Sequence, residues 1–184
     1  MSELSERFIK REEIYKGAVL DVVKDTVELP DGKEAFREVC LHVGAVCVIP
    51  YLPDGRVIME RQYRYAHGRV FWEIPAGKLN FKEENPLEAA KRELREETGT
   101  VAKSYTFLGA MVPSVAILSE RIYMYLAEDL SFGERELDED EFLDVELVPL
   151  DKLYEMVISG EIEDAKTQIA VLKLRDILEK RKKA

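Results

Sequence analysis

The chain has 184 residues, of which 46% are apolar, and this is enough for one hydrophobic core and a small appended module. A formal net charge of −10 argues against long nucleic acids as partners, because their binding depends on Lys and Arg that neutralise phosphates, and favours a small anionic substrate with divalent cations that neutralise both sides. No apolar run approaches the roughly 18 residues of a membrane-spanning helix, and the N-terminal sequence MSELSERFIKREE is too highly charged for a signal peptide, so we expect a soluble, cytoplasmic protein without a membrane partner.

The first predicted elements are β-strands. Apolar and polar residues alternate over residues 8–15, 19–29 and 34–42, with a turn at Pro30-Asp31-Gly32. Few of these residues are large and apolar, so this antiparallel β module should pack against something else. We therefore divide the chain into an N-terminal β module, residues 1–42, and a main domain, residues 43–184.

The main domain begins with a nearly continuous apolar run. Residues 43–52 predict a buried central strand, and Pro53-Asp54-Gly55 predicts a hairpin into a second strand over residues 56–63. Cys40 and Cys47 lie in apolar, strand-like runs, and two such residues indicate reduced core cysteines rather than a disulfide framework.

Several arginines follow in the stretch RQYRYAHGRVFWEIPAG. The side chains of Arg61, Arg64 and Arg69 each offer a planar fork of donors that matches phosphate oxygens. The same side chains could instead pair with the many acidic residues of this protein. The residues alone leave both interpretations open.

The best-defined element is a helix within GKLNFKEENPLEAAKRELREETG, residues 77–99. Asn85 can accept a hydrogen bond from a free amide as the N-cap, Pro86 suits the first helical position, and Gly99 suits a left-handed C-terminal cap. At about 100° per residue the helix has one apolar stripe that should face the core. This stripe is formed by Leu87, Ala90 and Leu94.

Three carboxylates lie beside that stripe, those of Glu93, Glu96 and Glu97. Residues three or four apart are neighbours on a helix, so each pair of like charges costs a few tenths of a kcal/mol. Glu97 should also be partly desolvated, because it lies beside Ala90 at the edge of the stripe. A hard divalent cation, Mg²⁺ or Mn²⁺, would offset both costs. The alternative is a solvated acidic face of the helix.

The C-terminal half predicts strands followed by helices. Strands are expected at residues 104–111, 122–127 and 142–150, and helices at residues 151–159 and 164–181. An acid-dense stretch at residues 134–146 precedes the last strand. These elements predict an α/β fold of the α+β type, with a mixed sheet between helices.

The segment Arg92-Glu93-Leu94-Arg95-Glu96-Glu97-Thr98-Gly99, together with Glu84 and Gly77, resembles the Nudix box of hydrolases that act on nucleoside diphosphates linked to another moiety. Six residues separate Gly77 from Glu84, where the family pattern has five. The resemblance implies a Nudix α/β/α sandwich with a mixed β-sheet. It also implies that Glu93, Glu97 and the carbonyl of Ala76 hold the metal, with Glu96 as a further ligand or a group that orients water.

Two further segments, Arg61-Gln62-Tyr63-Arg64-Tyr65 and Trp72-Glu73-Ile74-Pro75-Ala76-Gly77, are similar to the ADP-ribose pyrophosphatase branch of that family. The similarity implies a homodimer in which the N-terminal strands exchange contacts. It also implies a set of substrate-binding residues: Arg37, Arg61, Arg64, Glu73 and Glu120. Asp138-Glu139-Asp140-Glu141-Phe142 looks like the acidic loop that supplies a catalytic glutamate in this branch, which makes Glu139 and Glu141 alternative general bases.

The expected reaction is metal-dependent hydrolysis of the pyrophosphate of ADP-ribose, or of a similar nucleoside diphosphate sugar, to AMP and ribose 5-phosphate. Val115-Ala116 stand where the branch has a proline and a glycine that help to mark ADP-ribose preference, so GDP-mannose or another sugar nucleotide is an alternative substrate. The alternative in which the protein is not an enzyme is a non-catalytic sensor that binds a nucleotide.

Overall fold

The computed structural model describes residues 4–137 and 141–183. The chain forms two compact units: an N-terminal unit of Met1–Gly44 with Val112–Arg121, and a main unit of Ala45–Met111 with Ile122–Ala184. The segment 112–121 joins the N-terminal unit through backbone hydrogen bonds. The amide of Cys40 donates to the carbonyl of Ile117 at 2.7 Å, and the amide of Ser119 donates to the carbonyl of Cys40 at 2.9 Å.

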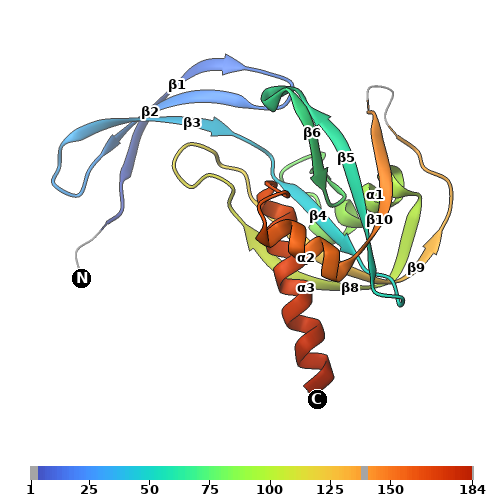
Figure 1. The fold of residues 1–184 in the computed structure, drawn as a ribbon. Helices are drawn as coiled ribbons and strands as arrows, with labels where there is room; N and C mark the ends of the chain where they lie inside the picture. Colours follow the sequence, from blue (N-terminus) through green and yellow to red (C-terminus); the bar gives the residue numbers. More distant parts are fainter. Residues whose placement is uncertain (1–3, 138–140, 184) are drawn as a thin grey trace. The chain divides into compact units, whose positions relative to one another are not determined.

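The N-terminal unit is built on a three-stranded antiparallel sheet. Its strands are β1 (Arg7–Lys16), β2 (Asp21–Glu28) and β3 (Glu34–Leu41), in the order β1-β2-β3 (Figure 1). The turn between β2 and β3 contains Gly32 with φ 83°, a backbone conformation that glycine adopts without steric cost. The predicted antiparallel β module is thus confirmed.

The main unit contains a four-stranded mixed sheet in the order β7-β4-β9-β8. Strands β4 and β9 run parallel, whereas the other pairs are antiparallel. This confirms the predicted mixed sheet. Its strands are β4 (Ala45–Pro50), β7 (Ala76–Lys78), β8 (Thr100–Met111) and β9 (Ile122–Phe132).

A second sheet of the main unit has the order β10-β5-β6 and is antiparallel. Its strands are β5 (Arg56–Arg64), β6 (Arg69–Glu73) and β10 (Leu143–Pro149), and a short 3₁₀ helix at Tyr65–His67 joins β5 to β6. The predicted turn between β4 and β5 is present, but the two strands do not form a hairpin, because they belong to different sheets. Within the described residues, the pairing stops at the bridge between Tyr51, which follows β4, and Val57 of β5, because β7 and β9 occupy the two edges of β4.

In its described residues, the main unit has three helices: α1 (Pro86–Thr98), α2 (Leu150–Ile158) and α3 (Ala165–Lys183). Helices α1 and α3 pack against the four-stranded sheet, and α2 packs against α3 and β10. Side chains alternate between the two faces of a strand. On β4, Cys47 and Ile49 belong to a hydrophobic core that includes residues of α2 and α3, while Val46 and Val48 are buried on the other face, where α1 packs. The sheet is therefore enclosed between helices, as the sequence predicted (Figure 1).

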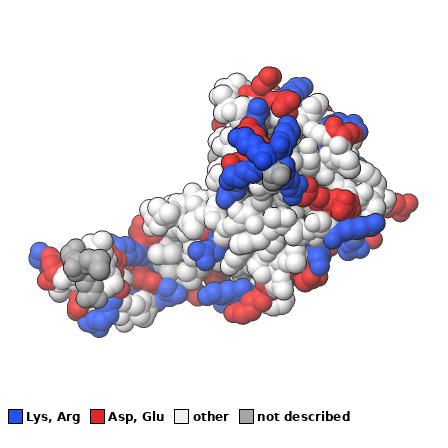
Figure 2. Space-filling view, turned by 90° about the horizontal axis from the view of Figure 1, so that it is seen from below, with Lys and Arg blue, Asp and Glu red and all other residues white. Residues whose placement is uncertain are grey.

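The last turn of α3 is strongly basic. Lys and Arg side chains gather around its C-terminal end (Figure 2), and the turn contains Lys180, Arg181, Lys182 and Lys183. Cations at this end of a helix interact favourably with the helix dipole. Arg181 also forms an ion pair with Glu128 at 2.6 Å, which fastens the end of the helix to β9. Within the described part of the chain, none of the helices has the length and apolar character needed to cross a bilayer.

Candidate active site

Helix α1 begins and ends at the residues that its sequence predicts. The Asn85 side chain accepts a hydrogen bond from the amide of Leu87 at 2.9 Å, and Pro86 is the first helical residue. Gly99 has φ 67°, and its amide donates to the carbonyl of Arg95 at 2.8 Å. These caps fix the helix register and therefore the direction of each of its carboxylates.

The carboxylates of Glu93 and Glu97 are buried rather than solvated. Only 9% of Glu93 and 3% of Glu97 is exposed. Gly77 makes this possible for Glu93, because a Cβ at position 77 would lie 2.0 Å from the Glu93 Cδ. The amide of Ala76 donates to Oε2 of Glu97 at 2.9 Å. The interpretation of these carboxylates as a solvated helix face is thus excluded for Glu93 and Glu97.

These side chains line a polar pocket of about 250 Å³ in the main unit. The pocket is lined by residues of α1, of β7 and the loop after it, and by one residue that precedes β10. They are Ala76, Gly77, Lys78, Asn80, Arg92, Glu93, Glu96, Glu97 and Glu141. The predicted metal-binding residues therefore share one pocket with one of the two predicted bases.

Arg92 organises the acidic face from within the helix. Its Nη1 donates to Oε1 of Glu93 at 2.7 Å and to Oε2 of Glu96 at 3.1 Å, and its Nη2 donates to the carbonyl of Lys78 at 3.3 Å. Glu84 accepts a hydrogen bond from the amide of Asn80 at 2.6 Å, which closes the loop between β7 and α1. Arg92 thus offsets part of the repulsion between neighbouring carboxylates.

The pocket nevertheless holds more negative charge than its own residues compensate. The pKa of Glu93 is raised to about 7, mainly by desolvation. Desolvation also raises the pKa of Glu97 well above its ordinary value, and the charges of Glu60 and Glu93 raise it further. Glu60 on β5 is also buried, and desolvation together with the charge of Glu141 raises its pKa to about 8. Among the residues that the structure describes, no group forms a hydrogen bond with Oε1 of Glu60.

This donor set fits a hard divalent cation, which prefers carboxylate oxygens and would neutralise the buried charges. Among the described residues, no three His, Cys, Asp or Glu side chains are already arranged around one point as metal ligands. Arg92 accounts for this in part, because its guanidinium lies between Glu93 and Glu96. A cation that enters the pocket would replace Arg92 as the partner of these carboxylates.

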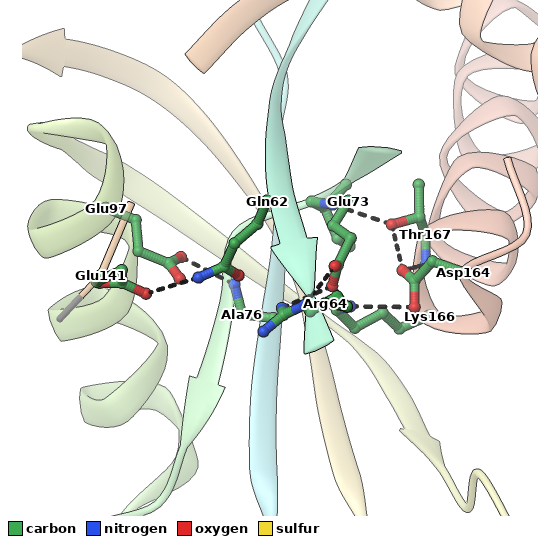
Figure 3. A network of polar contacts seen from close by, with 10 residues as sticks. Gln62, Arg64, Glu73, Ala76, Glu97, Glu141, Asp164, Lys166 and Thr167 are labelled. Atoms are coloured by element: carbon green, nitrogen blue, oxygen red, sulfur yellow. Dashed lines mark hydrogen bonds and ion pairs between the residues drawn. The ribbon is translucent and has the colours of Figure 1, made fainter. Parts of the chain in front are cut away.

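The face of β5 that carries Glu60 also presents Gln62 and Arg64, since alternate residues of a strand share a face. Gln62 Nε2 donates to Oε1 of Glu141 at 3.5 Å, which holds that predicted base at the pocket (Figure 3). The other predicted base, Glu139, lies outside the described residues.

Arg64 forms a bidentate ion pair with Glu73 on the neighbouring strand β6, with Nε at 2.6 Å and Nη2 at 2.8 Å from the carboxylate oxygens. Lys166 of α3 donates to the same carboxylate and lies 3.0 Å from Oδ1 of Asp164. Figure 3 shows that this chain of contacts continues to Thr167. The predicted substrate residues Arg64 and Glu73 are therefore partners of one another.

The remaining predicted substrate residues have other partners. Arg61 stacks over Trp72 with 5.5 Å between its Cζ and the ring centroid, and it pairs with Asp144 at 2.9 Å and Glu146 at 3.1 Å. The interpretation of Arg61 as a partner of acidic residues is thus realised in this structure. In the N-terminal unit, Arg37 pairs with Glu6, and Glu120 lies 3.5 Å from Nδ1 of His42.

The NUDIX domain family matches residues 41–169, which include this whole pocket. The chain belongs to the Nudix family. Both its helix caps and its buried glutamates fall in the matched region, and the protein is a Nudix hydrolase.

Individual relatives of this Nudix hydrolase extend over nearly the whole chain. It is 44% identical to the ADP-ribose pyrophosphatase of Bacillus subtilis (strain 168), covering 99% of this chain and 100% of the relative. It is 40% identical to the methanol dehydrogenase activator of Bacillus methanolicus, covering 94% and 95%. The crystal structure of an ADP compounds hydrolase shares the fold, with a TM-score of 0.85, 23% identity and 98% coverage of both chains.

Two buried charged residues of this Nudix hydrolase, Glu60 and Lys166, were not predicted from the sequence. Glu60 lies in the apolar stretch VIMERQYR, and its two-residue spacing from Gln62 and Arg64 was the available signal. Lys166 follows the N-cap Asp164 at the start of α3, where the amide of Thr167 donates to Oδ2 of Asp164 at 3.0 Å. A lysine at the first turn is usually solvated, so only the folded structure shows that this one is buried.

The raised pKa values of Glu60, Glu93 and Glu97 predict an unusual pH dependence of stability. An acid whose pKa is higher in the folded state binds more protons when folded, so stability is present at low pH and is lost as the pH rises from about 4.5 through 7 to 8. In EDTA, we expect the melting temperature to fall by on the order of 10 °C between pH 5.5 and 8. Mg²⁺ should reverse most of this fall. Scanning calorimetry measures both, and a metal-free melting temperature that is flat or rises over this range would contradict the prediction.

Proposed function

We propose that this Nudix hydrolase cleaves the pyrophosphate of ADP-ribose, or of a closely similar nucleoside diphosphate sugar, to give AMP and ribose 5-phosphate. The observation that carries this proposal is the pocket into which buried Glu93 and Glu97 converge beside Glu96 and Glu141. It is supported by the 44% identity to an ADP-ribose pyrophosphatase over nearly the full length of both chains.

Glu93, Glu97 and the backbone of Ala76 would hold Mg²⁺ or Mn²⁺, with Glu96 as a further ligand. The bound cation would neutralise pyrophosphate charge and increase the acidity of a coordinated water. The protein's own contribution is to present the buried carboxylates of Glu93 and Glu97, with Arg92 as a cation that pairs with Glu93. Net charge alone would repel an anionic substrate, so occupancy of this pocket by cations is the condition for substrate binding.

The general base would be a glutamate of the acidic stretch before β10, either Glu141 or Glu139. Glu141 lines the pocket and accepts a hydrogen bond from Gln62. Arg64 would bind a phosphate of the substrate through the part of its guanidinium that is exposed.

The test is incubation of the purified protein with ADP-ribose in Mg²⁺, in Mn²⁺ and in EDTA, with products separated by chromatography. AMP and ribose 5-phosphate that appear with a divalent cation and disappear in EDTA would support the proposal. Failure to form AMP from ADP-ribose under these conditions would reject it.

GDP-mannose is the second candidate substrate because of Val115-Ala116. Val115 is exposed in the loop that belongs to the N-terminal unit, and both side chains are bulkier than the glycine of the ADP-ribose pattern. The same assay with GDP-mannose in place of ADP-ribose separates the candidates. A higher kcat/KM for GDP-mannose would assign specificity to that sugar nucleotide.

We further infer a homodimer formed through the N-terminal unit. All ten residues of β1 are exposed, and they include the large apolar side chains of Phe8, Ile14 and Tyr15. Phe36 on β3 is exposed as well. Apolar patches of this kind mark interaction surfaces. Light scattering after size exclusion measures the mass, and a value near the 21.2 kDa of one chain would contradict the dimer.

A further inference from the structure

Glu73 is a buried carboxylate whose two oxygens both accept hydrogen bonds from protein cations. Only 5% of the residue is exposed. Arg64 donates to both of its oxygens, and Lys166 donates to Oε2. The ion pairs are the reason that the pKa of Glu73 lies below its usual range in spite of burial, since desolvation alone would raise it. A metal or a ribose that approached this carboxylate would therefore have to compete with Arg64 and Lys166.

Lys166 is buried as deeply, with 9% of the residue exposed. An isolated buried ammonium is very costly, so its contacts with Glu73 and Asp164 are what makes its burial possible. Asp164 is held in turn by Thr167, whose hydroxyl donates to Oδ2 at 2.6 Å and accepts a hydrogen bond from the amide of Ile74 at 2.9 Å. The start of α3 is thereby joined to the backbone that leads from β6 toward Ala76.

The network has two cations, Arg64 and Lys166, and two carboxylates, Glu73 and Asp164, so its charges sum to zero. Its members differ in their exposure to solvent. The side chains of Glu73 and Lys166 are 6% and 10% exposed, whereas that of Arg64 is 42% exposed. Arg64, Glu73 and Asp164 also line a second pocket of the main unit, of about 480 Å³. Arg64 is thus the most exposed member of the network, whereas the side chains of Glu73 and Lys166 are almost fully buried.

We propose that Lys166 and Glu73 are positioning residues that fix the guanidinium of Arg64 for the substrate's phosphate. Lys166 supplies a second positive charge to Glu73, so that Arg64 can stay bidentate with Glu73 while the exposed part of its guanidinium keeps more of its attraction for a phosphate. Glu73 acts through Arg64 and does not touch the substrate, in contrast to the direct substrate contact expected from the sequence. This inference rests on the proposed role of Arg64 in substrate binding.

The first variant is Lys166→Met, which keeps the length of the side chain and removes its charge. Arg64 then has to neutralise Glu73 alone, and its attraction for a phosphate falls. We expect KM for the substrate to rise about tenfold with kcat changed less than about threefold, the size expected when one charge-assisted contact is weakened. The double variant E73Q K166M removes both buried charges together and should raise KM similarly, because Arg64 loses its bidentate acceptor. It replaces the single variant if the latter does not fold.

Lys173→Met is the matched control. Lys173 is in the same helix, and its Nζ donates to the carbonyl of Leu108 at 2.8 Å, away from the network. The Lys173→Met variant should have a lower melting temperature, because this hydrogen bond is lost, and an unchanged KM. A rise in KM for Lys173→Met equal to that for Lys166→Met would assign the effect to general destabilisation and overturn the inference.

The decisive measurement is the double-mutant cycle with Arg64→Ala. If Lys166 acts through Arg64, Lys166→Met adds nothing to KM in the Arg64→Ala background. The inference would be overturned if the effects of the two substitutions on KM were fully additive, or if Arg64→Ala left KM unchanged. Neither outcome would affect the proposed function, which depends on turnover by the wild type.

An NMR readout is independent of turnover. The Nε–H of Arg64 should exchange slowly with solvent in the wild type and rapidly in E73Q K166M, and rapid exchange in the wild type would overturn the inference even if no substrate were cleaved. Absence of AMP in the wild type, by contrast, bears on the proposed function alone.

Discussion

Replacing Glu97 with glutamine should lower turnover of the substrate by roughly 10³-fold and leave the fold intact. Glutamine has the same shape and can still accept the hydrogen bond from the amide of Ala76, but it cannot provide the charge that a divalent cation requires. The metal-free variant should also melt at a higher temperature than the wild type at pH 8, because one of several mutually repelling buried carboxylates is gone.

Glu88→Gln is the control for this substitution. Glu88 lies on the same helix, but it is exposed and pairs with Lys91 at 2.7 Å. Surface ion pairs contribute little to stability, so this variant should match the wild type in turnover and in melting temperature. Near wild-type turnover in a folded Glu97→Gln protein would refute the assignment of Glu97 to the metal.

Replacing Gly77 with alanine should reduce kcat/KM by roughly 10²-fold, because the new methyl group takes the place of the Glu93 carboxyl group. The added Cβ would lie 2.2 Å from each oxygen of that carboxylate. The Glu93 side chain has to turn away from its buried position, and its hydrogen bond with Arg92 changes with it. Backbone strain is not the cause, since Gly77 is not among the positive-φ residues.

Gly133→Ala separates this effect from the general cost of adding a methyl group. A Cβ at position 133 would meet only the carbonyl oxygen of Gly99, at 3.3 Å. Steady-state kinetics and calorimetric titration with Mn²⁺ should show weaker metal binding in Gly77→Ala and little change in Gly133→Ala. Equal metal affinity in the wild type and Gly77→Ala would show that Glu93 does not need its position beside Gly77.

Local patterns predicted the elements with strong sequence signals. Helix α1 has an N-cap, a proline and a terminal glycine in order, and its observed bounds follow from them. The strands of the N-terminal sheet and helices α2 and α3 also lie within a few residues of their predicted ranges. The short strands β6 and β7 were not predicted, because arginines and prolines in that stretch hide the alternation that a strand normally shows.

Partners that are distant in the sequence could not be predicted. The turn after β4 is local and was found, but the sequence does not show that β7 and β9 flank β4 and send β5 into another sheet. Similarly, Glu73 and Lys166 are 93 residues apart, and nothing in either segment indicates that Lys166 donates a hydrogen bond to Glu73.

By itself the sequence determined the register of α1, and with it the common side of Glu93, Glu96 and Glu97, since helical spacing and capping depend on neighbouring residues alone. Tertiary structure decided which of these carboxylates are desolvated, because burial of Glu97 depends on β7 and that of Glu93 on the absence of a side chain at Gly77. It also decided that Arg64 faces Glu73 and Lys166, since charge pairing in a protein interior is set by which strands and helices pack together.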